Sequence, residues 1–335
     1  MRGSWWLFVV AFSIPLSAQT DLVLKNAFIE ANKNRATMDI TLEVDHVLKN
    51  VHKIKSGGDD GDIHMSGRSD DVKLPLVVEI MNAGLPDEKA PLADAHNADG
   101  GKTVQVSGAW RIWFEHPGGD QIQGEDVPVP DDTNPDHVFE IHPVTKFAGD
   151  DATLSFVPIQ GYTAYDAQTA FGHYDKLQAT IASTETSTTI SATKIGYNYA
   201  QFVIQLAGAP VKSDDGGFLV LAKVMQDEEE AVVDESLRMV FAPNTPPASL
   251  VANCAAGATL KVLGIPRVNL ERVSFMTSQQ PGQTFDAKLP YEMIIVGVFD
   301  ESKNACALSA SNAPPANTPQ DRPSSRTGRR KPPRR

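Results

Sequence analysis

The stretches "PLADAHNADGGKTVQVSG" (91–108) and "PASLVANCAAGATLKVLG" (247–264) align without a gap, 156 residues apart. Each follows a hydrophobic strand pattern, contains a Gly turn, and ends in an apolar run that predicts another strand. A five-stranded barrel of the oligonucleotide/oligosaccharide-binding (OB) type has this order, with its helix between the third and fourth strands. The repeat therefore predicts tandem small OB-like β-barrels in an all-β protein, with two β-sandwich domains as the alternative. The identical pairs are Pro91/Pro247, Asn97/Asn253, Gly101/Gly257, Thr103/Thr259, Val106/Val262 and Gly108/Gly264.

The rest of the chain also has the pattern of an all-β protein. Short runs rich in Val, Ile, Thr and aromatic residues alternate with Gly, Pro, Asp and Asn, which favours strands joined by turns. The acidic run "MQDEEEAVVDE" (225–235) predicts either a helix or a charged hairpin loop. The predicted strands are 36–55, 61–68, 74–81, 102–116 and 137–147 in the first half, and 176–193, 198–208, 217–225, 236–242, 258–264, 268–276 and 290–299 in the second.

The N-terminal segment "MRGSWWLFVVAFSIPLSA" (1–18) predicts a secretory signal peptide. Arg2 gives it a positive start, an apolar run follows, and small residues allow cleavage near Ala18. No later segment is apolar over the roughly 18 residues of a membrane span, so we expect a secreted or periplasmic protein without a transmembrane segment. The remaining chain predicts a histidine-bearing first barrel-like domain (19–160), a second barrel-like domain (161–308) and a disordered Pro/Arg-rich tail (309–335).

Charge is distributed unevenly along the chain. The formal net charge is −12, but residues 310–335 hold seven basic residues and one acidic residue, which leaves the body 19–309 near −19. Such a body repels phosphate, so nucleic acid is disfavoured as its partner. The Arg-rich tail either attaches to an anionic envelope surface or folds back on the acidic body.

The chain has two cysteines, Cys254 and Cys306. In an oxidising compartment they can pair, whereas two buried free thiols are the alternative. We predict the disulfide.

All eight histidines lie between residues 46 and 173, so the second half is expected to be a scaffold or to present a different surface. Two predicted strands repeat an acid–Ile–His pattern, in "DIH" (62–64) and "EIH" (140–142). Alternate residues of a strand face the same side, so each acid shares a face with its histidine, and Glu79 lies on a polar face of its own strand. If these strands adjoin, the side chains converge on a divalent metal ion or orient a histidine as a general base. Ordinary alternation in half-solvated strands is the alternative.

Two further residues are candidate ligand contacts. His116 precedes a proline, as His142 does, which holds it in extended geometry at a strand end near a barrel rim. Arg68 is a candidate anion contact, with an exposed strand-end arginine as the alternative. The candidate ligand-binding residues are Asp62, His64, Arg68, Glu79, His116, Glu140 and His142, and the candidate metal ligands among them are Asp62, His64, Glu140 and His142.

Common catalytic motifs are missing from the sequence. It contains no P-loop, no GxSxG, no HExxH and no paired CxxC, and its "GDDGD" run lacks the spacing of a calcium-binding loop. These absences remove most of the support for serine hydrolases and zincins.

Four stretches resemble an uncharacterised family of secreted bacterial proteins with a GDxHxxGR … EIHPVT pattern: "GDDGDIHMSGR", "LPLVVEIMNA", "GAWRIWFEH" and "NPDHVFEIHPVT". In the second half, "IGYNYAQFVIQL", "VLGIPRVNL" and "LPYEMIIVGVF" are similar to the longer members. The resemblance implies small β-barrels and no particular activity. The positions that match its motifs are Asp60, Gly61, Asp62, His64, Glu79, Glu140, His142 and Pro143.

These observations predict a secreted or periplasmic ligand-binding protein with a carboxylate/histidine site in its first domain, which holds its ligand directly or through a divalent metal ion. The first alternative is a metal-assisted hydrolase of a phosphodiester or a glycan, in which His64 and His142 ligate the metal or act as a base. The second alternative is a structural protein of the cell envelope, attached through its tail. Whether the protein is an enzyme stays open.

Overall fold

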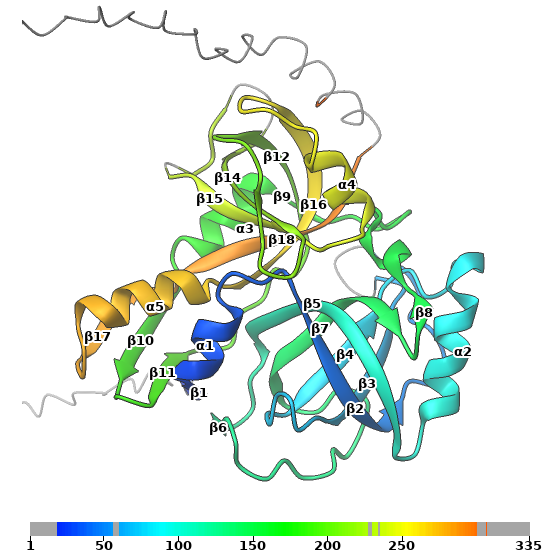
Figure 1. The fold of residues 1–335 in the computed structure, drawn as a ribbon. Helices are drawn as coiled ribbons and strands as arrows, with labels where there is room; N and C mark the ends of the chain where they lie inside the picture. The colour runs from blue at the N-terminus through cyan, green and yellow to red at the C-terminus, as the bar shows by residue number, and fades with distance from the viewer. Residues whose placement is uncertain (1–18, 56–59, 227–229, 234, 300–305, 307–335) are drawn as a thin grey trace, which may run out of the picture.

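Two closed five-stranded barrels and a third, open sheet make up the computed structural model (Figure 1). It describes residues 19–55, 60–226, 230–233, 235–299 and 306. The predicted signal peptide and the predicted tail lie outside the described residues. Within the described part of the chain, no helix is both long and apolar enough to span a bilayer.

The first barrel has the strand order β4-β3-β2-β5-β7 and closes by parallel pairing of β4 with β7. Its third and fifth strands are therefore the parallel pair, and helix α2 lies between the third and fourth strands, as in an OB fold. Alternate residues of the strands fill the interior with buried apolar side chains such as Ile63, Val78 and Ile141. The elements are β2 (Thr37–Val47), β3 (Ile63–Arg68), β4 (Leu76–Ile80), α2 (Lys89–Ala98), β5 (Lys102–His116) and β7 (His137–Phe147).

The second barrel repeats this topology. Its order is β14-β15-β18-β16-β12, it closes by pairing β14 with β12, and β15 runs parallel to β18. The first copy of the sequence repeat lies in α2 and β5, and the second copy lies in α4 and β16, so the prediction of tandem OB-like barrels is confirmed. The elements are β12 (Ala200–Leu206), β14 (Phe218–Met225), β15 (Leu237–Phe241), α4 (Pro246–Val251), β16 (Thr259–Val268) and β18 (Tyr291–Val298).

The glycine that ends each copy of the repeat has a physical reason. Gly108 and Gly264 both lie at register shifts, where the fourth strand bends around its barrel. A Cβ atom on Gly108 would lie 2.7 Å from the carbonyl oxygen of Pro143, and one on Gly264 would lie 3.1 Å from the carbonyl oxygen of Ile294. In the first barrel the fifth strand thus approaches too closely for a side chain, and in the second barrel it leaves less room than a Cβ atom normally has.

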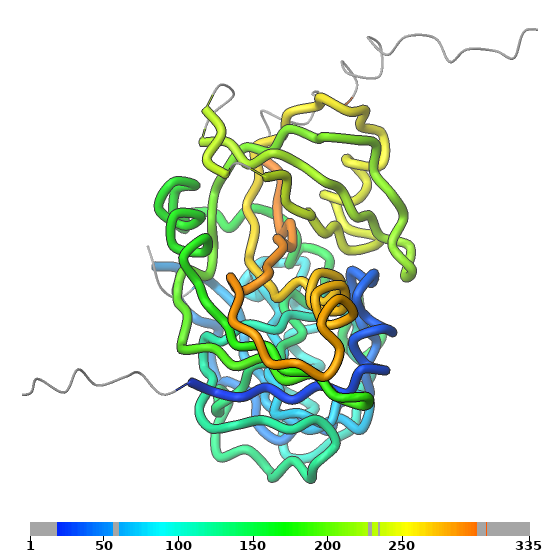
Figure 2. Tube along the Cα trace, turned by 90° about the vertical axis from the view of Figure 1, so that its left-hand side faces the viewer, coloured from blue at the N-terminus to red at the C-terminus, as the bar shows by residue number. Residues whose placement is uncertain are grey.

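The third sheet, in the order β17-β10-β11-β1-β6, takes strands from both predicted domains. Helix α1 lies against α5 beside this sheet, as the blue and orange segments of Figure 2 show. The division of the chain at residue 160 stays a prediction. The elements are β1 (Thr20–Lys25), α1 (Asn26–Asn32), β6 (Gln121–Ile122), β10 (Gln178–Ser183), β11 (Ser187–Ala192), α5 (Leu270–Gln279) and β17 (Thr284–Lys288). The remaining short elements are η1 (Pro86–Glu88), β8 (Asp150–Asp151), η2 (Thr153–Phe156), β9 (Tyr165–Asp166), α3 (Ala167–Tyr174) and β13 (Val211–Lys212).

The predicted strand 268–276 is wrong, because most of it belongs to helix α5. The side chain of Asn269 caps the helix by accepting a 2.9 Å hydrogen bond from the backbone N–H of Arg272. Leu270 and Val273, one turn apart, are its buried residues. Of the two interpretations of 225–235, the described residues show the hairpin loop, since Met225 pairs with Ala231.

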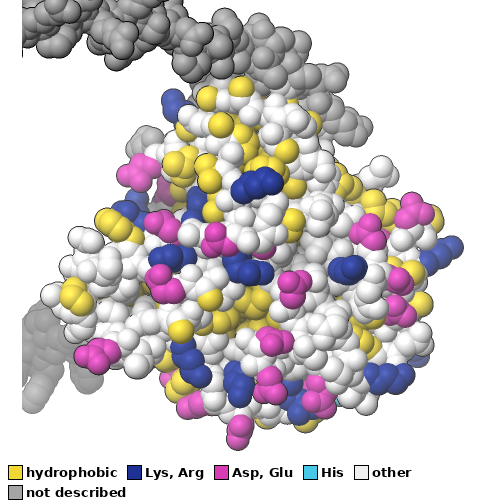
Figure 3. Space-filling view, in the orientation of Figure 1, with side chains coloured by type: hydrophobic (Ala, Val, Ile, Leu, Met, Phe, Trp, Pro, Cys, Tyr) yellow, Lys and Arg dark blue, Asp and Glu magenta, His cyan; other side chains and the backbone are white. Residues whose placement is uncertain are grey.

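The two barrels meet in an apolar cluster, which places the outer face of the first barrel against the second. The described members of this cluster include Met81 and Ala109 from the first barrel and Val240, Leu263, Ile265 and Ile294 from the second. On the outer surface shown in Figure 3, acidic and basic side chains are interspersed.

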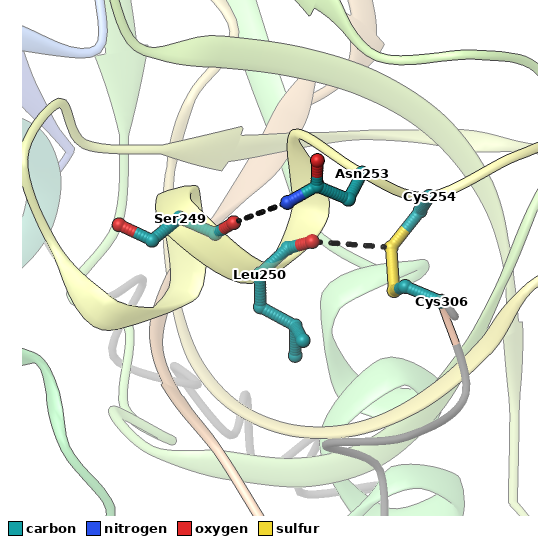
Figure 4. Close-up of a disulfide and its surroundings, with 5 residues drawn as sticks. All are labelled: Ser249, Leu250, Asn253, Cys254 and Cys306. Atoms are coloured by element: carbon teal, nitrogen blue, oxygen red, sulfur yellow. Dashed lines mark hydrogen bonds between the residues drawn. A yellow bond between two sulfur atoms is a disulfide. The ribbon is translucent and has the colours of Figure 1, made fainter.

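A disulfide joins Cys254, just after α4, to Cys306 (Figure 4). The Sγ atom of Cys254 also lies 3.6 Å from the carbonyl oxygen of Leu250 in that helix. The bridge therefore ties the end of the described chain to the helix of the second barrel.

Candidate functional site

A polar cavity of about 400 Å³ lies on the outer face of the first barrel, where the chain leading into the second barrel covers it. Ile63, Val78 and Ile141 point into the barrel. Their polar neighbours therefore point outward, into the cavity. The lining residues are His52, Asp60, Asp62, His64, Glu79, Glu115, His116, Asn134, Glu140, Tyr162, Tyr165, Tyr197, Asn198 and Tyr199.

Strand register brings five of the seven predicted residues together. His64 on β3 lies directly opposite Glu79 on β4, and Glu140 on β7 pairs in register with Val77 on β4. The members of this group are Asp62, His64, Glu79, Glu140 and His142.

A buried group of possible metal ligands is formed by Asp60, Glu79 and His142. One ligand atom from each lies within 4.8 Å of the others, and all three side chains are buried. The Nδ1 atom of His142 lies 2.7 Å from Oε2 of Glu79, yet it has no partner with hydrogen-bond geometry. A buried nitrogen in this position is available to a cation.

Tyr199 sets the orientation of the His142 ring. Its hydroxyl donates a hydrogen bond to Asp60 and lies 2.7 Å from Nε2 of His142. Because the tyrosine proton is directed at Asp60, Nε2 must be the donor to the tyrosine oxygen. In the neutral ring this leaves the lone pair on Nδ1, facing Glu79. Histidines that ligate metals are commonly fixed in this way by a hydrogen bond through the other ring nitrogen.

The second group of possible ligands, His52, Asp62 and His64, lies beside the first. Oδ1 of Asp62 is 2.9 Å from Nδ1 of His52, and Oδ2 contacts Nε2 of His64. Among the described residues these two are the groups whose donor atoms could hold a metal ion.

Electrostatics favours a cation in the cavity. Burial and repulsion from Asp62 raise the pKa of Asp60 well above its usual value. Burial alone would lower the pKa of His64, but attraction by Glu79 and Asp62 raises it to about 10. Burial likewise opposes protonation of His142, and the negative charges of Glu79 and Glu140 raise its pKa. These carboxylates therefore favour positive charge in the cavity.

Glu140, predicted as a metal ligand, is held by other partners. Its Oε2 lies 2.6 Å from Nη1 of the fully buried Arg111, and its Oε1 lies 3.0 Å from Nε2 of His137. His142 Nδ1 is 3.4 Å away. Glu140 thus neutralises a buried arginine beside the two ligand groups.

The other two predicted residues lie apart from the ligand groups. Arg68 is hydrogen-bonded to Asp45 at 2.8 Å and to Glu43 at 2.9 Å. His116 lines the cavity, but its ring stacks on His137 with the centroids 5.3 Å apart.

The second half supplies a wall of the cavity, contrary to the prediction that it is only a scaffold or a different surface. Tyr162, Tyr165, Tyr197 and Tyr199 come from the chain that leads into β12. Rings of Tyr165 and Tyr197 lie 4.6 Å apart, and those of Tyr162 and Tyr199 lie 5.2 Å apart. In the sequence, the closely spaced tyrosines of "YNY" (197–199) are the pattern that could have indicated this aromatic wall.

The second barrel has no equivalent ligand group in its described residues, and strand register explains why. Arg267 lies opposite Glu292 as Arg111 lies opposite Glu140. Ile294 follows Glu292 by two residues, as His142 follows Glu140, so it is the counterpart of His142. Val240 pairs with Ile294 across the parallel strands and is therefore the counterpart of Glu79. Both apolar residues pack in the cluster between the barrels.

No protein-family model matches the chain, and no curated protein matches it. The resemblance to uncharacterised secreted bacterial proteins therefore stays a prediction, and the chemistry of the site carries the functional argument.

Proposed function

We propose that this protein works outside the cytoplasm as a ligand-binding protein, and that its cavity binds a divalent transition-metal ion through Asp60, Glu79 and His142. The observation that carries the proposal is the position of His142 Nδ1, which is buried, lacks a hydrogen-bond partner and lies 2.7 Å from a carboxylate oxygen. An imidazole nitrogen this close to a carboxylate oxygen in a buried site needs positive charge at the nitrogen, which a proton or a bound metal ion supplies.

The donor set suits first-row ions. One imidazole nitrogen and two carboxylate groups favour Mn²⁺, Fe²⁺ or Zn²⁺, since softer ions prefer sulfur and Mg²⁺ or Ca²⁺ prefer oxygen alone. Three protein ligands leave coordination positions open toward the rest of the cavity. Tyr162, Tyr197 and Asn198 line that space, so a small molecule with an oxygen or nitrogen donor can complete the coordination.

The disulfide supports the extracytoplasmic part of the proposal. Bonds such as Cys254–Cys306 form and persist in oxidising compartments, whereas cytosolic thiols are kept reduced. The sequence "MRGSWWLFVVAFSIPLSA" supports the same location.

The test is calorimetric titration of the chelator-treated protein with Zn²⁺ and with Mn²⁺. We expect saturable binding by the wild type and at least a 100-fold weaker affinity in the His142→Asn and Glu79→Gln variants. His96→Ala is the matched control, because His96 is an exposed histidine on α2, away from the cavity. Equal affinity in the cavity variants and the control would contradict the proposal.

A further inference from the structure

The carboxylate of Glu79 faces both groups of ligands at once. Its Oε2 lies 2.7 Å from Nδ1 of His142 in the first group, and its Oε1 lies 3.4 Å from Nε2 of His64 in the second. A carboxylate that directs one oxygen at each of two donor sets is arranged to bridge two ions.

We propose that a second divalent ion binds at His52, Asp62 and His64, bridged to the first ion by Glu79, so that the cavity holds a two-ion centre. This inference rests on the proposed function, since it takes the ion at Asp60, Glu79 and His142 as its neighbour.

Asp62 provides the independent observation at the second group. Its side chain is buried, and Oδ2 has no partner with hydrogen-bond geometry although it contacts the ring of His64. Two imidazoles and one carboxylate, with one ligand atom from each inside 4.8 Å, form a donor set used for Fe²⁺, Mn²⁺ and Zn²⁺.

The turn before β3 explains how two aspartates separated by a single glycine serve different ions. Gly61 has φ +83°, a conformation that L side chains rarely adopt, and it turns the chain between Asp60 and Asp62. The backbone N–H of His52 donates a 2.9 Å hydrogen bond to the carbonyl oxygen of Asp62, which holds the histidine beside the second group.

Charge balance is compatible with two ions. Asp60, Asp62 and Glu79 supply three negative charges, while Glu140 is already neutralised by Arg111. Two divalent ions would therefore leave one net positive charge, which an anionic ligand or a hydroxide can balance. Paired ions that share a carboxylate clamp a water or an oxyanion between them, the arrangement of two-metal hydrolases. Such a pair of ions would also provide the catalytic centre of a metal-assisted hydrolase, the alternative function that the sequence suggests.

The test is the number of Mn²⁺ ions bound at equilibrium, combined with electron paramagnetic resonance of the loaded protein. We expect two equivalents in the wild type, with the spectrum of an exchange-coupled pair. His52→Ala should reduce binding to one equivalent with an uncoupled six-line spectrum, because the side chain of His52 is 30% exposed and its loss leaves the first group intact. His96→Ala should retain both ions.

The outcomes separate the two proposals. One equivalent that is lost in His142→Asn but retained in His52→Ala would overturn the second ion and leave the proposed function standing. Two equivalents without spin coupling would place the second ion elsewhere and overturn the inference. No bound ion in the wild type would overturn both proposals.

Discussion

Arg111 and Arg267 bind the two barrels to each other by reciprocal hydrogen bonds. Nε of Arg111 donates to the carbonyl oxygen of Pro266 at 3.0 Å, and Nη1 of Arg267 donates to the carbonyl oxygen of Trp110 at 3.0 Å. The two arginines are 156 residues apart, the same offset as the sequence repeat, and each forms an ion pair with a glutamate on its own fifth strand. The barrels therefore meet through an isologous contact of the kind found in two-fold dimers.

This contact predicts a large stability loss in the Arg267→Ala variant. The guanidinium is fully buried, lies 3.6 Å from the centroid of the Trp110 ring and pairs with Glu292 at 2.7 Å. Its removal leaves a buried carboxylate with fewer partners, which costs about 3 kcal/mol or more. Urea unfolding followed by tryptophan fluorescence measures this loss. The exposed Arg272→Ala is the control, and a loss below about 1 kcal/mol in Arg267→Ala would contradict the prediction.

The Glu140→Gln variant should be less stable than the wild type but should bind the same number of metal ions. Glu140 is the partner of Arg111 and His137, so the variant should lose roughly 2–4 kcal/mol of unfolding free energy. Because neither ligand group depends on its oxygens, metal stoichiometry should stay unchanged below the unfolding transition. Metal analysis beside circular dichroism checks this. Loss of metal from a folded Glu140→Gln protein would instead support the prediction that Glu140 is a metal ligand.

The Gly61→Ala variant should lose metal affinity although its stability should fall only slightly. Residue 61 has φ +83°, and the new Cβ atom would lie 3.0 Å from Cγ1 of Ile54. We expect a stability loss of about 1 kcal/mol and at least a tenfold weaker metal affinity, since Asp60 and Asp62 would shift. Gly119→Ala, where a Cβ meets no atom within 4 Å, is the matched control. Calorimetric affinities equal to those of the control would show that the turn does not position the ligands.

Glu88, outside the cavity, should make stability depend on pH. Burial, and then repulsion from Asp151, raises the pKa of this carboxyl group from 4.5 to about 7. A folded-state pKa above the unfolded one means that the stabilising contribution is complete below pH 4.5 and is lost as the pH rises through 7. With allowance for solvent screening, the loss is on the order of 2 kcal/mol.

Urea unfolding at a series of pH values between 4.5 and 8 measures this contribution. Glu88→Gln should flatten the dependence, whereas the exposed Asp126→Asn should keep the wild-type slope. The same slope in all three proteins would assign the pH dependence to other groups.

Local patterns allowed the barrels to be predicted because strand alternation and the Gly-terminated repeat are visible in adjacent residues. All five strands of the first barrel were predicted. Helix α5 was missed because the capping residue Asn269 and the helical spacing of Leu270 and Val273 were outweighed by the β-branched residues nearby. The third sheet could not be predicted, since β1 pairs with β6 at a sequence separation of 99 residues and with β11 at separations of 162 to 172 residues.

The ligand cluster was predictable only in part. Alternation placed His64 and His142 on polar faces, and pairing of the strands then made them converge. The contributions of His52 and Tyr199 follow from loops whose course no local pattern reveals. The ion pair of Glu140 could not be predicted, because the sequence does not show that Arg111, one strand away, lies directly opposite it.

The most direct measurement is an anomalous-scattering map from crystals of the protein grown with Mn²⁺ or Zn²⁺, recorded on both sides of the metal absorption edge. We predict a peak within coordination distance of Asp60, Glu79 and His142. A map with no peak in the cavity, in crystals whose solution held saturating metal, would contradict the proposal that the cavity is a metal site.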